Sequence, residues 1–187
     1  MFIQTEPTPN PNSMKFIPDG LEVAGDRITE YKNKDQAVGK SKLAEELFEI
    51  HGVDSILFGS DFITVNKASN KDWLEIKTEI LTAIMDFFIS KKPVFNEVVE
   101  NKSESNEEDS EVVKQIKELL EVKIRPAVAM DGGDIIYRGF ENGIVLLELK
   151  GSCSGCPSST VTLKNGIENM LKHYVPEVIA VEQVSEE

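Results

Sequence analysis

Residues 135–157 read IIYRGFENGIVLLELKGSCSGCP, and this stretch decides the fold of the second half of the chain. Two apolar runs, Ile135 to Phe140 and Ile144 to Leu149, flank the pair Asn142-Gly143. Both residues of that pair tolerate positive φ, so the pattern predicts a tight β-hairpin. The loop after the hairpin holds two cysteines and ends in a proline, which suits the first turn of a helix.

The segments on either side of the hairpin predict helices. Before it lies an apolar stripe of helical spacing that runs towards Arg125-Pro126: Val112, Ile116, Leu119 and Leu120. After the cysteine loop comes a second such stripe: Leu163, Ile167, Met170, Leu171 and Tyr174. Residues 178–184 predict a final short strand. The second half is therefore expected to fold in the order α-β-β-α-β.

The first half predicts another mixed domain. Strands are expected over residues 1–6, 13–17, 55–58 and 62–66. Ser41 is a suitable N-cap for a helix through Ile50, and Asp72 for a longer helix. The longer helix has an apolar stripe that we interpret as core: Trp73, Ile76, Ile80, Ile84, Phe87 and Phe88. This half contains no cysteine, so its sequence gives no indication of chemistry.

An acidic segment separates the two halves. From Glu97 to Glu111 the chain reads EVVENKSESNEEDSE, which is too polar to offset the entropy of ordering. We therefore predict an α+β protein of two small mixed domains. The N-terminal domain would span residues 1–92, a flexible acidic linker 93–110, and the C-terminal domain 111–187.

Charge and composition exclude several classes of function. The 187 residues have a formal net charge of −13, which would repel a phosphate backbone and argues against a nucleic-acid partner. No apolar run is long enough for a membrane helix. The N-terminus resembles neither a secretory signal nor an Arg-rich transit peptide. We therefore expect a cytoplasmic protein, or a mature organelle protein that has lost its presequence.

Cys153 and Cys156 are the chain's two cysteines, and a disulfide closing so short a loop would stabilise little. In a reducing compartment such a pair binds metal or does redox chemistry. A helix beginning at Pro157 would point free N–H groups and a positive dipole at both thiols. The position therefore predicts lowered thiol pKa values. Gly151 and Gly155 would let the backbone turn tightly around a bulky group.

Several alternatives remain for this loop. A dithiol–disulfide oxidoreductase would use Cys153 as nucleophile, although the strand and helix order is not that of thioredoxin. A structural zinc site needs four ligands, and the remaining candidates, His51 and His173, are poorly placed in sequence. A pair of inert buried cysteines fits poorly with the surrounding glycines and serines. A protein-interaction adaptor would need neither cysteine.

An iron–sulfur cluster usually takes four thiolates, and this chain supplies two. A second chain or outside thiols would have to complete the set, and a symmetric dimer with facing loops meets this requirement. A cluster shared between two short loops should be easy to release. Half a ligand set per chain therefore favours a carrier over an electron-transfer protein.

The motifs also resemble a known family. Residues 124–126 (IRP), 130–134 (MDGGD), 151–159 (GSCSGCPSS) and 162–164 (TLK) are similar to the C-terminal domain of NifU-like proteins, the Nfu-type iron–sulfur scaffolds. Residues 4–12 (QTEPTPNPN) and 58–65 (FGSDFITV) resemble the N-terminal domain of the Nfu branch. For the 131–134 motif, the residues themselves indicate only a turn.

The resemblance implies a [4Fe–4S] cluster ligated by Cys153 and Cys156 in a homodimer and transferred to apo iron–sulfur client proteins. It leaves open whether a [2Fe–2S] form is also bound. The further cysteine-bearing domains of long NifU proteins are absent from this sequence, so upstream assembly proteins would supply the cluster. Such a carrier breaks no bond in an organic substrate and is not an enzyme.

Overall fold

The computed structural model describes residues 1–96, 109–155 and 157–185, which form two compact units. Each unit combines helices with its own sheet, so the predicted α+β class with two small domains is confirmed. Residues 97–108 lie outside the described residues, and the flexible linker over 93–110 stays a prediction. Val94 packs in the N-terminal core, beyond the predicted end of that domain at residue 92.

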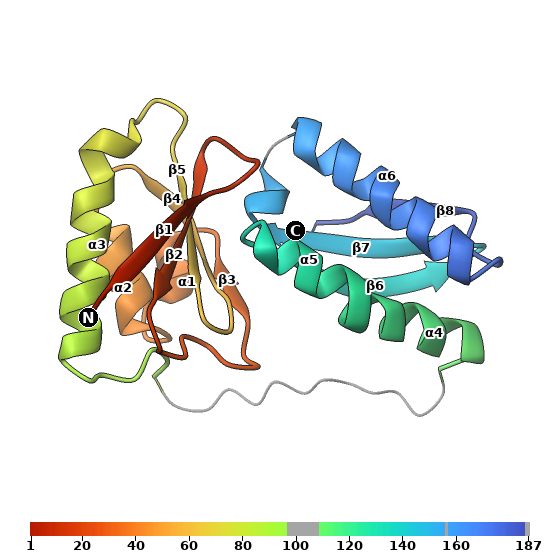
Figure 1. The fold of residues 1–187 in the computed structure, drawn as a ribbon, viewed down its shortest axis with the longest axis horizontal. Coiled ribbons are helices and arrows are strands. Elements are labelled where there is room, and N and C mark those ends of the chain that lie inside the picture. The colour runs from red at the N-terminus through yellow and green to blue at the C-terminus, as the bar shows by residue number, and fades with distance from the viewer. Residues whose placement is uncertain (97–108, 156, 186–187) are drawn as a thin grey trace. The chain divides into compact units, whose positions relative to one another are not determined.

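The N-terminal unit is a five-stranded antiparallel sheet of strand order β1-β2-β5-β4-β3, with helices on one face (Figure 1). Its strands are β1 (Ile3–Pro7), β2 (Ser13–Pro18), β3 (Thr29–Tyr31), β4 (Val53–Phe58) and β5 (Ile63–Lys67). Its helices are α1 (Lys34–Ala37), α2 (Lys42–Phe48) and α3 (Trp73–Ile89). The sequence did not predict β3 or α1.

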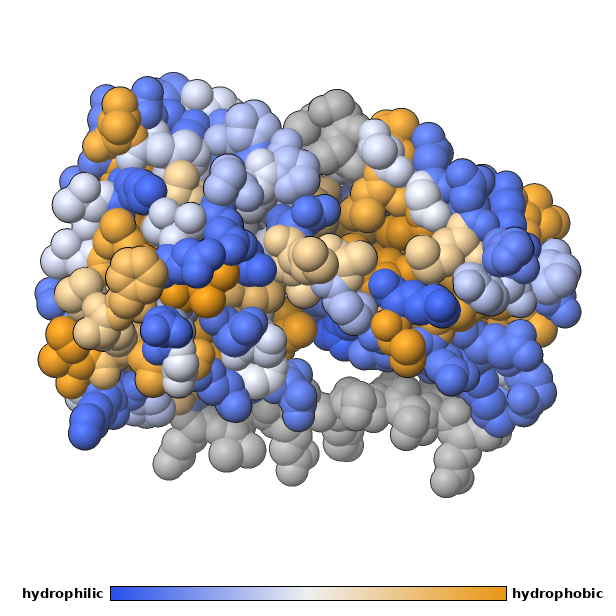
Figure 2. All heavy atoms as spheres, viewed as in Figure 1, coloured by the Kyte–Doolittle hydropathy of each residue, from blue (hydrophilic) through white to orange (hydrophobic). Residues whose placement is uncertain are grey.

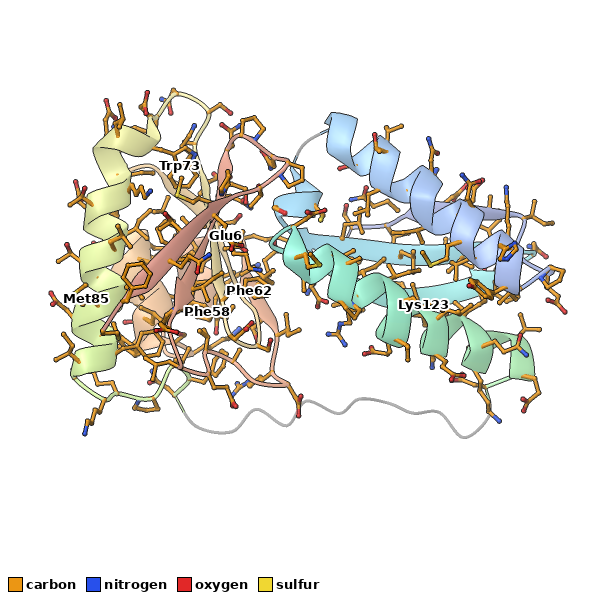
Figure 3. All side chains as sticks on the ribbon, viewed as in Figure 1. Glu6, Phe58, Phe62, Trp73, Met85 and Lys123 are labelled. Atoms are coloured by element: carbon orange, nitrogen blue, oxygen red, sulfur yellow. The ribbon has the colours of Figure 1, made fainter. Side chains whose placement is uncertain are left out.

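The apolar stripe of α3 lies in the core as predicted. Ile76, Ile80, Ile84 and Phe87 are buried, and the flanking aromatic residues of the helix are partly buried. Figure 3 shows Trp73 at the start of α3. Its ring N–H donates to the Pro11 carbonyl at 3.0 Å, which joins the helix to the proline-rich loop between β1 and β2.

Both predicted N-caps are confirmed. Ser41 Oγ accepts from the Ala44 N–H at the start of α2 and donates to the Val94 carbonyl at 2.6 Å. The Asp72 side chain accepts from the Leu74 N–H at the start of α3. The Ser41 hydroxyl therefore satisfies a helix end and also fixes residue 94 against the core.

The C-terminal unit has the predicted α-β-β-α-β order. Its elements are α4 (Glu111–Leu119), the π-helical turn η1 (Leu120–Ile124), α5 (Arg125–Met130), β6 (Gly133–Glu141), β7 (Ile144–Gly151), the 3₁₀ turn η2 (Ser152–Ser154), α6 (Pro157–Tyr174) and β8 (Ala180–Gln183). Strand order is β6-β7-β8, with β6 and β7 antiparallel and β8 parallel to β7.

The predicted hairpin turn between β6 and β7 is confirmed. Asn142 and Gly143 have φ of +53° and +80°, the positive values that a type I′ turn requires. Within residues 1–96, 109–155 and 157–185, none of the helices has the length and apolar content needed to cross a membrane.

Helices α4–α5 and α6 pack on one face of the C-terminal sheet (Figure 1). Their buried side chains, which include Ile116, Val128, Ile167 and Leu171, meet those of the strands. Figure 2 shows apolar atoms along the seam between the two helical segments. Lys123, labelled in Figure 3, bridges them where its Nζ lies 5.1 Å from the centre of the Tyr174 ring.

Candidate functional site

The loop between β7 and α6 positions Cys153. Gly151 closes β7 with φ +67° and ψ −134°, a conformation that side-chain-bearing residues rarely adopt. Cys153 then lies in η2, and its carbonyl accepts from Thr160 Oγ1 at 2.9 Å. Helix α6 begins at Pro157, as the sequence predicts. Cys156 lies outside the described residues, so the structure does not test its expected position at the start of this helix.

The Cys153 side chain points into the domain rather than towards solvent. The residue is 6% exposed, belongs to the C-terminal hydrophobic core, and its thiol is free. Its sulfur rests against Gly133 so closely that a Cβ built on that glycine would lie 2.4 Å from Sγ. The same Cβ would lie 3.0 Å from the Lys150 carbonyl oxygen and 3.1 Å from a Val128 methyl. Glycine at position 133 therefore makes room for the buried thiol.

The prediction of a lowered thiol pKa is wrong for Cys153 in this conformation. Burial raises the pKa of the Cys153 thiol to about 11, and the hydrogen-bonding contact with Ser152 offsets this only in part. The physical reason is that a thiolate in this pocket would lose its hydration. The glycines and serines around Cys153 do not make its side chain exposed, because the backbone of the loop turns the sulfur inwards.

The Asp131-Gly132-Gly133-Asp134 motif forms the turn that the sequence indicated, and it is bound to the cysteine loop. Gly132 has φ +77° and accepts from the Ser152 N–H at 3.2 Å. Ser152 Oγ donates to the Asp131 carbonyl, and Gly133 pairs with Gly151 at the end of the β6–β7 ladder. We refer to residues 131–133 as the DGG turn. Its third residue, Gly133, lies against the Cys153 sulfur.

An ion pair holds the residue that follows this turn. Arg125 Nε and Nη2 donate to the two carboxylate oxygens of Asp134 at 2.7 and 3.2 Å. Asp134 is 2% exposed, while Arg125 also reaches Glu121 at 2.8 Å. The hydrogen bond to Asp134 raises the pKa of Arg125, which stays charged. Sequence reasoning gave no role to either residue, although both lie in the quoted family motifs.

The π-helical turn η1 immediately precedes Arg125. Pro126 has no N–H to donate, so the helix from α4 to α5 cannot keep its regular ladder at this point. The Arg125 N–H instead reaches back five residues to the Leu120 carbonyl. Insertions of this kind are frequent at functional sites. Arg125, the residue directly after this turn, pairs with Asp134 of β6.

One histidine lies in the domain that lacks the cysteine loop, and the other lies away from that loop within its own unit. His51 follows α2 in the N-terminal unit, and the His173 ring contacts Tyr174 at the far end of α6. Among the described residues, which exclude Cys156, no three His, Cys, Asp or Glu side chains gather into a group able to hold a metal ion.

Comparison with known proteins identifies both halves. A family model described as "Scaffold protein Nfu/NifU N terminal" matches residues 3–91, and one described as "NifU-like domain" matches residues 116–182. The human "NFU1 iron-sulfur cluster scaffold homolog, mitochondrial" is 54% identical over 188 residues, covering 100% of this chain and 73% of that protein. The protein of the same name from Drosophila ananassae is 52% identical, and the match covers 98% of this chain and 64% of that protein.

A solution structure of a NifU-like protein from Saccharomyces cerevisiae matches with a TM-score of 0.47 at 32% identity, over 52% of this chain and 87% of that one. The identity and coverage of the human relative, together with the two family models, establish the relationship. The chain belongs to the Nfu/NifU family of scaffold proteins.

Proposed function

We propose that this chain is an iron–sulfur cluster carrier. It binds a [4Fe–4S] cluster through Cys153 and Cys156, shares it with a second copy of itself, and transfers it to apo-proteins. The main support is the match of the NifU-like domain to residues 116–182, which include the cysteine loop, in a chain whose relatives are named iron–sulfur cluster scaffolds.

The donor set fits this cargo. A [4Fe–4S] cluster takes four thiolates, and two chains together supply two copies each of Cys153 and Cys156. Gly151 and Gly133 carry no side chain next to the Cys153 loop. Because the Cys153 sulfur is buried against Gly133 in this structure, cluster loading requires the side chain to turn outwards and lose its proton.

Transfer proceeds by ligand exchange. A client thiolate takes the place of Cys153 or Cys156 on one iron, and the displaced cysteine regains its proton. Repetition of this exchange moves the cluster to the client without breaking any bond in an organic substrate, so the protein is a carrier and not an enzyme. An upstream assembly protein supplies the cluster. The compartment would be the matrix of mitochondria or the cytoplasm of a bacterium. The named relatives are mitochondrial, which supports the first of the two.

Anaerobic reconstitution with iron and sulfide tests the proposal. The parent chain should bind about two irons and two sulfides per chain, and its mass should become that of a dimer. Cys153→Ser and Cys156→Ser should each lose the visible absorbance. The loaded parent should then activate an apo-dehydratase that requires a [4Fe–4S] cluster. About one iron per chain would instead indicate a shared [2Fe–2S] form. A colourless monomer that reversibly forms a Cys153–Cys156 disulfide would refute the carrier and favour the dithiol oxidoreductase.

A further inference from the structure

We propose that Arg125 and Asp134 are positioning residues for Cys153: their ion pair holds the DGG turn in place, and the turn in turn holds the cysteine loop. The relevance to cluster handling rests on the proposed carrier function. The positioning itself concerns the chain without a cluster and can be tested there.

The first link is the ion pair. The guanidinium of Arg125 binds both carboxylate oxygens of Asp134, a planar two-bond arrangement that fixes direction as well as distance. Asp134 is nearly inaccessible to solvent and directly follows the DGG turn at the start of β6. Arg125 begins α5, which leads into the same turn from the other side. The pair therefore closes the base of a loop whose two ends are nine positions apart in the chain.

The second link joins the DGG turn to the cysteine loop. Two of its carbonyls, those of Asp131 and Gly132, accept from the side chain and the backbone of Ser152. Its third residue, Gly133, touches the Cys153 sulfur. A shift of the turn by a fraction of an ångström would thus change both the hydrogen bonds of residue 152 and the wall that shelters the thiol of residue 153.

The same sheet contains a second arginine–carboxylate pair that serves as a matched control. Arg138 Nε donates to Glu148 Oε2 at 2.7 Å, and Glu148 is 2% exposed, like Asp134. Asp134 pairs with Lys150 in the β6–β7 ladder, whereas Glu148 pairs with Ile136, two residues further from the turn. A general loss of stability would follow from removing either pair, but only the Arg125–Asp134 pair adjoins the DGG turn.

The experiment removes each pair as a double substitution, because a lone substitution would leave an uncompensated buried carboxylate. Arg125→Met with Asp134→Leu is compared with Arg138→Met with Glu148→Leu. Both are placed in a Cys156→Ser background, where Cys153 is the only thiol. The readout is the rate at which iodoacetamide alkylates Cys153 in the folded apo chain, with the rate in denaturant as reference and circular dichroism to verify folding.

The Arg125/Asp134 double variant should be alkylated about tenfold or more faster than its background, because the sheltered state opens more often. The Arg138/Glu148 variant should stay within about twofold of it. Equal rates in the two doubles, or no acceleration in the first, would overturn the proposal. If the first double does not fold, Arg125→Lys, which keeps the charge but loses the two-bond geometry, replaces it and should accelerate alkylation about threefold.

A second measurement separates this proposal from the carrier function. With both cysteines present, the Arg125/Asp134 variant should lose its reconstituted cluster several-fold more slowly than the Arg138/Glu148 variant, because the buried state of Cys153 that competes with ligation is weakened. If the parent chain binds no cluster, the carrier function fails, while the alkylation rates still decide whether Arg125 and Asp134 position Cys153. If the parent binds a cluster and the two doubles lose it equally fast, the pair does not act on cluster retention and the proposal is refuted.

Discussion

Gly133→Ala tests the packing of the buried thiol most directly. The added Cβ would lie 2.4 Å from the Cys153 sulfur, and real Cβ contacts essentially never fall below 3.0 Å. To reach 3.4 Å the sulfur must move by 3.4 − 2.4 = 1.0 Å. The Lys150 carbonyl at 3.0 Å and the Val128 methyl at 3.1 Å prevent the new methyl from shifting away. The Cys153 side chain must therefore leave its present position against residue 133.

The expected cost is that of overpacking a core, about 1–3 kcal/mol of unfolding free energy in the C-terminal unit. Chemical denaturation of the apo chain followed by circular dichroism measures it. The N-terminal unit is followed in the same samples by fluorescence, because the single tryptophan of the chain, Trp73, lies there, and its midpoint should not change. Alkylation of Cys153 should become faster. Cluster loading should restore part of the lost stability, because a ligating Cys153 has already left the pocket.

Gly139→Ala is the matched control on the same strand. A Cβ there would meet only a Leu146 methyl at 3.6 Å, an ordinary contact. This variant should therefore keep the parent stability to within about 0.5 kcal/mol. If Gly133→Ala and Gly139→Ala shift the midpoint equally, or if neither alters the reactivity of Cys153, the thiol does not occupy the pocket described above and the reasoning fails.

Three further predictions concern other parts of the chain. Ser41→Ala removes the N-cap of α2 and the hydrogen bond to the Val94 carbonyl. It should therefore destabilise the N-terminal unit by about 1–3 kcal/mol in denaturation followed by tryptophan fluorescence, and an unchanged midpoint would contradict this. Gly143→Ala should lower the unfolding free energy of the C-terminal unit by about 1–3 kcal/mol, because φ at this position is +80° and the new Cβ would lie 2.6 Å from Ile179 Cδ1. The denaturation midpoint followed by circular dichroism measures this loss. The stability that Cys153 contributes should depend on pH. Its folded-state pKa of about 11 exceeds the ordinary 9.0, so the contribution is complete below pH 9 and is lost as the pH rises towards 11. The stability difference between the parent and Cys153→Ala should shrink by about 2–3 kcal/mol over that range, and a constant difference would contradict the burial of the thiol.

Local signals in the sequence predicted much of the fold. The hairpin turn follows from two adjacent residues that accept positive φ, and the starts of α2 and α3 from single capping side chains. Each of these features is settled within a few residues. The strand β3 has only three residues and α1 only four, too few for a hydrophobic period to be visible. Their existence depends on pairing with β4 and packing on α2, which no local pattern encodes.

The candidate site also combines features that depend on neighbouring residues with features that depend on distant ones. The start of α6 at Pro157 could be predicted, because it depends on neighbouring residues. The direction of the Cys153 side chain could not, because the glycine that makes room for it stands twenty positions earlier in the chain. The Arg125–Asp134 pair likewise joins a helix to a strand. The sequence shows both residues within family motifs, but it does not show that their side chains contact each other.

The burial of Cys153 bears on how a carrier releases its cargo. A thiol with a pKa of about 11 is harder to deprotonate in place than an ordinary thiol by about 3 kcal/mol. On the proposed function, the buried side chain therefore has to leave its pocket to ligate the cluster. In the proposed carrier, the sulfur regains its proton when the cluster departs and packs again inside the domain. On the proposed function, this return of Cys153 to Gly133 and Val128 opposes cluster retention in each chain. A site with exposed, preformed thiolates would hold the cluster more tightly and would therefore deliver it less readily.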